Sequence, residues 1–412
     1  MTRTDAAARD AADPLRRFRD RFVLDDLIYF DGNSLGRLPV ATRDRLRHVV
    51  EHEWGVELIR GWDGWIDLAR RTGDVLARVL GVRPGEVIVS DSTSVNLYKL
   101  AAAALDARPG RTVIVTDDAN FPTDRYVLAG LAQARGATLR VVESDVDGGV
   151  STKDLRPALK KDVALVSLSH VAYRSGSIVD MPGITALAHQ TGALTLWDLS
   201  HSAGAVPVPL RSSHVDLAVG CTYKHLNAGP GAPAFLYVRE DLQSVLRQPI
   251  WGWFGQRDQF DMGPEYEPVD GIERFLVGTP GVLGLTAALE GASITAEAGI
   301  EAIFDKARAL TSYAVELHEE WLEPLGFTLA SPRDPWHRGA HVTLHHPQAW
   351  PVCQALKAAG VIPDFRVPDR LRLGFAPLYT RFVDVYDGLA RLRELVAAGR
   401  HRDYPAARSR VT

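Results

Sequence analysis

The sequence predicts an α/β protein with a large, mostly parallel sheet and a second, smaller α+β domain. Short apolar, β-rich runs alternate with amphipathic helical segments through the first two thirds of the chain. This repeated alternation is typical of a doubly wound parallel sheet. After residue 281 the pattern changes to long helices followed by short strands. We therefore expect an N-terminal arm that also serves the small domain (1–50), a large domain (51–280) and a C-terminal small domain (281–412).

The elements follow in order along the chain. Residues 4–21 suggest a solvated, frayed helix, and residues 40–80 have apolar positions at helical spacing, interrupted at the glycines around Trp62. Strands are expected at 86–90, 111–117, 138–145, 162–170, 195–197, 215–220 and 234–238, then at 339–346 and 370–377. Helices are expected at 97–107, 122–132 and 181–192, the last closed by Gly192.

Composition excludes several classes of protein. The 412 residues are 46% hydrophobic and 24% charged, with a formal net charge of -4, which gives no general attraction to nucleic acid or to anionic lipid. No apolar run approaches the roughly 20 residues that span a bilayer. Cys221 and Cys353 lie far apart, so we expect neither a disulfide framework nor a CxxC site. These features favour a cytoplasmic protein.

One carboxylate and one lysine stand where two apolar strands end. Asp198 follows Leu-Thr-Leu-Trp, and Lys224 follows Val-Asp-Leu-Ala-Val-Gly by three residues. Ligands of open α/β sheets bind at the carboxyl ends of the strands. A pyridinium ring carrying an aldehyde satisfies both groups, because its nitrogen pairs with the acid and its aldehyde forms a Schiff base with the amine. An ordinary buried salt bridge is the alternative.

The same edge of the sheet carries an anion site and a ring-stacking position. Strand 86–90 leads through Ser92, Thr93 and Ser94 into a helix, where free backbone N–H groups and the helix dipole attract an anion. A simple N-cap explains these hydroxyls equally well. Phe121, at another strand exit, is placed to stack on a flat cofactor, with Asp124 in the helical turn that follows.

Four histidines near the C-terminal strands invite a metal interpretation. However, strand alternation directs His345 and His346 to opposite faces, and no carboxylate or cysteine completes a set with His337 and His341. We expect solvated strand histidines and no metal site.

An ordered set of segments resembles one known family. The segments are YFDGNSLGRLP, STSVN, NFPTDRY, WDLSHSAGAVP, TYKHLNAGPG, GWFG, GTP and RLGFAPLY. In this order, and over most of the chain, they resemble the kynureninases, pyridoxal-phosphate (PLP) enzymes with the aspartate-aminotransferase fold (fold type I).

The resemblance implies roles for particular cofactor-binding residues. Lys224 would carry the cofactor as a Schiff base, and Asp198 would pair with its ring nitrogen, supported by His201. Phe121 would stack on the ring, and Asp124 would assist nearby. The phosphate would be held by Thr93, Ser94 and Tyr223, and by Trp253 and Thr279 from a neighbouring subunit of a homodimer.

The resemblance also implies a reaction. Kynureninases use water to cleave the Cβ–Cγ bond of L-kynurenine, giving anthranilate and L-alanine. Arg372, with Asn33 close by, would clamp the substrate carboxylate; Lys224 would remove the Cα proton, and Tyr223 would return a proton to the product. Trp62 and Thr279 resemble the residues of members that favour kynurenine over 3-hydroxykynurenine. The alternatives are a cysteine desulfurase, a class V aminotransferase or a non-catalytic protein of the same fold.

Overall fold

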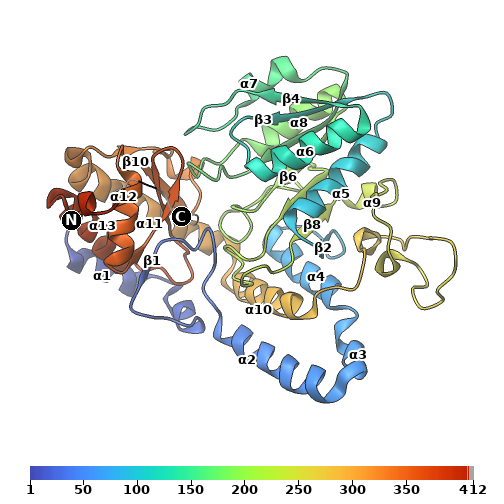
Figure 1. Ribbon diagram of the computed structural model, residues 1–412, viewed down its shortest axis with the longest axis horizontal. Helices are drawn as coiled ribbons and strands as arrows, with labels where there is room; N and C mark the ends of the chain where they lie inside the picture. The colour runs from blue at the N-terminus through green and yellow to red at the C-terminus, as the bar shows by residue number, and fades with distance from the viewer. Residues whose placement is uncertain (406, 408–412) are drawn as a thin grey trace.

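A seven-stranded sheet forms the centre of the larger part of the molecule (Figure 1). The computed structural model describes residues 1–405 and 407. The strand order is β2 (Val87–Val89), β8 (Phe235–Val238), β7 (Leu217–Gly220), β6 (Leu194–Asp198), β5 (Val163–Ser169), β3 (Val113–Asp117) and β4 (Thr138–Val142). Only β8 runs antiparallel to its neighbours, so the predicted mostly parallel sheet is confirmed.

Helices cover both faces of this sheet (Figure 1). They are α4 (Leu68–Leu80), α5 (Thr93–Asp106), α6 (Pro122–Arg135), α8 (Met181–Thr191) and α10 (Val282–Ala298), with the short α7 (Thr152–Leu155) and α9 (Glu240–Gln243). Helix α5 contacts strands β5 to β8 through a buried Leu- and Ala-rich face. Apolar strands that are buried on both sides are the physical reason that the chain stacks as helix, sheet and helix.

The smaller part is built on a four-stranded antiparallel sheet, in the order β12 (Asp364–Arg366), β13 (Arg370–Gly374), β10 (His341–His345) and β9 (Thr328–Leu329). Helices α11 (Ile300–Trp321), α12 (Ala349–Ala358) and α13 (Phe382–Ala397) pack with it. Strand β1 (Ile28–Tyr29), from the N-terminal arm, pairs in parallel with β11 (Val361–Ile362).

Two hydrophobic cores indicate where the parts divide. Leu285 and Ala292 of α10 belong to the core of the large sheet, whereas Leu310 of α11 and Ile28 belong to the core of the small one. The division at residue 281 stays a prediction, and the packing of α10 argues for placing the boundary at Gly299, which separates α10 from α11.

The N-terminal segment is ordered by tertiary contacts, so the expectation of a frayed helix was wrong, whereas most of its side chains are exposed, as expected. Helix α1 (Arg3–Ala12) begins with a capping box between Thr2 and Asp5 and packs against α13. The Asp10 carboxylate accepts hydrogen bonds from the backbone N–H groups of Phe382 (2.7 Å) and Val383 (3.1 Å). It therefore caps a helix that lies more than 370 residues further along the chain.

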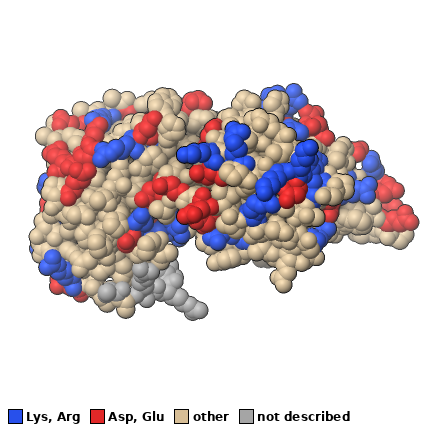
Figure 2. Space-filling view, turned by 90° about the horizontal axis from the view of Figure 1, so that it is seen from above, with Lys and Arg blue, Asp and Glu red and all other residues tan. Residues whose placement is uncertain are grey.

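Residues 40–65 project from the body of the molecule as a helical arm (Figure 1). Helix α2 (Val40–His48) continues into π-helical residues Val49–Glu57, a 3-10 turn (Leu58–Gly61) and α3 (Trp62–Trp65). The face shown in Figure 2 carries both positive and negative side chains. Within residues 1–405 and 407, none of the helices is long and apolar enough to cross a membrane.

Candidate active site

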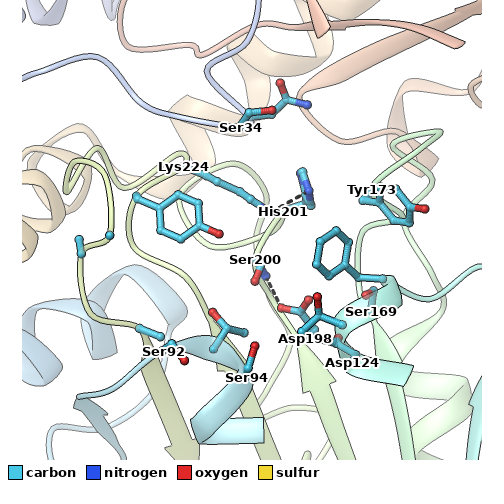
Figure 3. Close-up of a pocket in the computed structure, with 18 of the residues that line it drawn as sticks. Ser34, Ser92, Ser94, Asp124, Ser169, Tyr173, Asp198, Ser200, His201 and Lys224 are labelled. Atoms are coloured by element: carbon cyan, nitrogen blue, oxygen red, sulfur yellow. Dashed lines mark hydrogen bonds between the residues drawn. The ribbon is translucent and has the colours of Figure 1, made fainter. Parts of the chain in front are cut away.

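A cavity of about 540 Å³ opens where the large sheet, the small domain and the N-terminal arm meet (Figure 3). It lies at the carboxyl ends of β5 and β6 and at the first turn of α5, the edge of an α/β sheet where ligands bind. Ten of the residues proposed from sequence line it together: Asn33, Thr93, Ser94, Phe121, Asp124, Asp198, His201, Tyr223, Lys224 and Arg372.

Lys224 lies in the turn after β7, and its side chain points into the cavity (Figure 3). Its Nζ lies 3.0 Å from His201 Nε2 and 6.0 Å from the centroid of the Phe121 ring. Burial, and to a lesser extent the charge of Lys224, lowers the pKa of His201 well below its usual value. A neutral imidazole therefore stands beside the amine, so its Nε2 can accept a hydrogen bond from it.

Asp198 and Asp124 form a buried carboxyl pair at the base of the cavity (Figure 3). Asp198 ends β6 and accepts a hydrogen bond of 2.8 Å from the backbone N–H of Ser200. Burial first, and then the charge of Asp198, raise the pKa of Asp124 well above its usual value. Burial and the neighbouring carboxylate therefore favour the protonated form of Asp124, and the carboxyl pair can accept a hydrogen bond from a pyridinium nitrogen.

The first turn of α5 forms the anion-binding end of the cavity. Ser92 is the N-cap, and its Oγ accepts a hydrogen bond of 3.4 Å from Val95 N. Thr93 and Ser94, in the first turn of the helix, line the cavity, so their hydroxyls and the free N–H groups face it. The neighbouring Cys221, and after it burial, raises the pKa of Tyr223. The phenol therefore keeps its proton and can donate a hydrogen bond at the anion-binding end of the cavity.

Arg372 stands at the opposite end, on β13, with 1% of its surface exposed. It donates hydrogen bonds of 2.7 Å to the Tyr173 carbonyl and to Ser34 Oγ, and it forms an ion pair of 2.6 Å with Asp364. Its Nε and both amide atoms of the fully buried Asn33 have no partner among the described residues. Buried polar atoms of this kind need a ligand, and a carboxylate suits them.

The remaining predicted residues lie outside this cavity in the single chain. Trp62 packs in an aromatic group, with its ring 5.8 Å from Trp65 and 6.1 Å from Phe254. Trp253 joins the same group at 4.5 Å from Phe254. Thr279 is exposed and lines a neighbouring cavity of about 370 Å³. Their proposed roles stay predictions, and those of Trp253 and Thr279 concern the site of a neighbouring subunit.

Sequence reasoning assigned no role to several residues that line the cavity. Ser169 ends β5, Ser200 follows Asp198, and Arg366 pairs with Asp364 at 2.7 Å. The position of Ser169 and Ser200 at strand exits was the available signal, whereas nothing local marks Arg366. His341 and His346 are buried, with 1% and 8% of their surfaces exposed, so the expectation of solvated histidines was wrong for both.

Metal ligands do not gather near these histidines in residues 1–405 and 407. No group of three His, Cys, Asp or Glu side chains is placed there to hold a metal ion. The cavity instead offers an amine, a buried carboxyl pair, an aromatic ring and a helix N-terminus, four groups that suit PLP. Asp124 Oδ2 and His201 Nδ1, both buried, have no protein partner in the described chain, as expected for atoms that face a bound ring.

The fold and the cavity together define a PLP-dependent enzyme of fold type I. Residues 65–347 match the model of the class V aminotransferases, and residues 303–392 match that of the kynureninase C-terminal domain. The chain therefore belongs to the kynureninase family, PLP-dependent hydrolases that act on carbon–carbon bonds. The family, the fold type and the cofactor predicted from the sequence are thus confirmed.

Similar proteins support this assignment over almost the full chain. The kynureninase of Pseudomonas fluorescens is 45% identical over 404 residues, which cover 96% of this chain and 95% of the relative. That of Burkholderia pseudomallei (strain 1106a) is 46% identical with the same coverage.

Solved structures share the fold at lower identity. The apo cysteine desulfurase of Thermococcus onnurineus NA1 has a TM-score of 0.80 at 21% identity, covering 93% of this chain and 98% of that one. A C-DES mutant with glycine linked to its PLP cofactor has a TM-score of 0.79 at 18% identity, covering 91% and 99%. At these identities the likeness shows the fold and not the reaction.

Proposed function

We propose that the enzyme cleaves the Cβ–Cγ bond of L-kynurenine with water to give anthranilate and L-alanine. The observation that carries this proposal is that Lys224, the Asp124–Asp198 pair and Arg372 share one cavity of about 540 Å³. The amine and the carboxyl pair suit the two ends of a PLP ring, and the buried arginine suits the carboxylate of an amino acid.

The residues that would hold PLP come from different elements of the large domain. Lys224 would bind its aldehyde carbon, Asp198 would pair with its ring nitrogen, and Phe121 would pack on its face. Thr93, Ser94 and Tyr223 would donate hydrogen bonds to its phosphate. When bound, PLP supplies an electron sink for the electron pair released as a substrate bond breaks.

The substrate would lie between Lys224 and Arg372. The guanidinium fixes the substrate carboxylate, which places the Cα–H bond toward the lysine amine. In its free-amine form, Lys224 Nζ would remove this proton, and the neutral His201 imidazole, 3.0 Å away, accepts a hydrogen bond from the amine and orients it. The Tyr223 phenol, whose pKa is raised by Cys221 and by burial, returns a proton to the product carbon.

The finer choice of substrate rests on two residues outside the cavity. Trp62 and Thr279 resemble those of family members that favour kynurenine over its 3-hydroxy form, so 3-hydroxykynurenine is expected to be the lesser substrate. Comparing kcat/KM for the two compounds in the same product assay tests this preference.

We also propose that the enzyme is a cytoplasmic homodimer with shared active sites. A cavity of about 400 Å³ lined by Trp54, Trp65 and Leu283 lies between the helical arm and α10. Near it, Val56, Leu58 and Ile59 expose 61 to 77% of their surfaces. A second copy of the chain would cover this apolar surface. The free, buried Cys221 and Cys353 suit a reducing compartment.

The direct test is to incubate the purified enzyme and PLP with L-kynurenine and to record the fluorescence of anthranilate. We expect product in the wild type and in a Lys153→Ala control, since Lys153 is exposed on α7. The Lys224→Ala variant should lose both turnover and the visible absorption of lysine-bound PLP. Amine exchange that depends on a keto acid, without anthranilate, would instead indicate an aminotransferase, and sulfide release from cysteine a desulfurase.

A further inference from the structure

A second lysine of the large domain lies directly behind the phosphate end of the cavity. Lys99, on α5, has no exposed surface. Its Nζ lies 2.6 Å from Asp91 Oδ2 and 2.7 Å from the carbonyl oxygen of Phe275, and 3.5 Å from Ser90 Oγ. A buried ammonium in this environment serves as a fixed point, because each of its hydrogens has an acceptor within reach.

Asp91 occupies a demanding position in the turn between β2 and α5. Its backbone φ is +50°, which lies in the left-handed region that residues other than glycine seldom adopt. About 30% of its side chain is exposed, and it lines the active-site cavity next to Ser92, Thr93 and Ser94. An unpaired carboxylate at this point would face the bound phosphate and repel it.

We propose that Lys99 is a positioning residue for the phosphate end of the cofactor site. This inference rests on the proposed placement of the phosphate at the first turn of α5. Lys99 neutralises Asp91 and turns its carboxylate away from the phosphate, so the strained turn presents hydroxyl and N–H donors without an opposing negative charge.

The Lys99 amine also connects the turn that carries Asp91 to the segment that carries Phe275. Phe275 belongs to a short 3-10 helix (Ile272–Phe275) that leads into the loop carrying Thr279. Burial lowers the pKa of Lys99, and the charge of Asp91 opposes that shift. The ion pair therefore counteracts the effect of burial on the amine, and the two hydrogen bonds of the amine tie the turn to the loop.

The test separates binding of the phosphate from binding of the ring. Apoprotein is titrated with PLP and with pyridoxal, which lacks the phosphate, and binding is followed by absorbance. In Lys99→Met the affinity for PLP should fall by about tenfold, while the affinity for pyridoxal stays unchanged. In the double variant Lys99→Met with Asp91→Asn the preference for PLP should return, because asparagine tolerates the left-handed backbone and carries no charge.

Lys306 provides a matched control in the small domain. Its Nζ lies 2.6 Å from Asp13 Oδ2, and only 7% of its surface is exposed. The Lys306→Met variant loses a buried ion pair of the same length, so its melting temperature should fall as in Lys99→Met. The ratio of PLP to pyridoxal affinity should remain that of the wild type.

Further outcomes distinguish this inference from the proposed site itself. The Thr93→Val variant should also lose its preference for PLP over pyridoxal; if it keeps that preference, the phosphate is not bound at α5. Two outcomes would overturn the role of Lys99. In the first, Thr93→Val loses its preference for PLP over pyridoxal while Lys99→Met keeps it. In the second, Lys99→Met loses this preference and the double variant does not regain it. Should Lys99→Met not fold, Asp91→Asn decides: an equal or stronger preference for PLP supports the proposal, and a weaker one refutes it.

Discussion

Replacing Arg372 with lysine probes the substrate end of the cavity without removing its positive charge. The guanidinium bridges three elements, through the Tyr173 carbonyl, Ser34 Oγ and Asp364, and its Nε remains for a ligand. A lysine ammonium has three donors on one atom and cannot reproduce this planar fork. The substrate carboxylate would therefore lose at least one charge-assisted hydrogen bond.

The size of the effect follows from that loss. One hydrogen bond to a charged group is worth about 1.5 to 3 kcal/mol, so kcat/KM for L-kynurenine should fall by roughly ten- to a hundredfold. Because the interaction is present in the substrate complex as well, most of the loss should appear in KM. The rate of anthranilate formation, measured over a range of kynurenine concentrations, gives both constants.

Arg338 is the matched control for this experiment. It is likewise fully buried, donates to the Arg333 carbonyl at 2.9 Å and to Ser312 Oγ at 3.2 Å, and does not line the cavity. Arg338→Lys should lower the thermal stability and leave KM unchanged. If Arg372→Lys keeps the wild-type KM, or if both variants change KM alike, Arg372 does not bind the substrate carboxylate.

Two further predictions concern pH and assembly. Burial raises the pKa of Asp117 to about 6, so the folded protein holds this proton more tightly than the unfolded chain does. The proton therefore contributes at most about 3 kcal/mol to the free energy of unfolding. This contribution is present below pH 4 and is lost as the pH rises through 6. The free energy of unfolding of Asp117→Asn, measured by urea titration, should therefore rise relative to that of the wild type as the pH increases from 4 to 7. A difference between the two proteins that stays constant over this range would contradict this reasoning. Ile59 of the helical arm is 77% exposed, so Ile59→Asp should give monomers in sedimentation equilibrium where the wild type and Tyr126→Asp, at a residue 72% exposed, give dimers. A dimeric Ile59→Asp would exclude this surface.

Much of the fold was predictable because its signals are local. Apolar runs such as those before Asp198 and Lys224 indicate buried parallel strands, and the helices between them show their own periodicity. Since the carboxyl ends of parallel strands meet at one edge, these two residues could be placed in one site from their positions alone. The family resemblance then supplied roles for residues such as Arg372 that no local pattern explains.

Other features depend on contacts between segments far apart in the chain. Helix α1 was expected to fray, because nothing in residues 4–21 indicates that Asp10 caps α13. The sequence likewise does not reveal that burial, together with the charge of Asp198, raises the pKa of Asp124. Nor does it reveal that Lys99, one helical lysine among several, is buried against Asp91.

The sequence by itself therefore determined the class of fold and the family, and it predicted which groups would hold the cofactor. The tertiary structure decided which charges are buried, which are paired and which are left for a ligand. The reason is physical: secondary structure and strand ends depend on neighbours within a few residues, whereas the protonation and hydrogen bonding of a side chain depend on every group that folding brings around it.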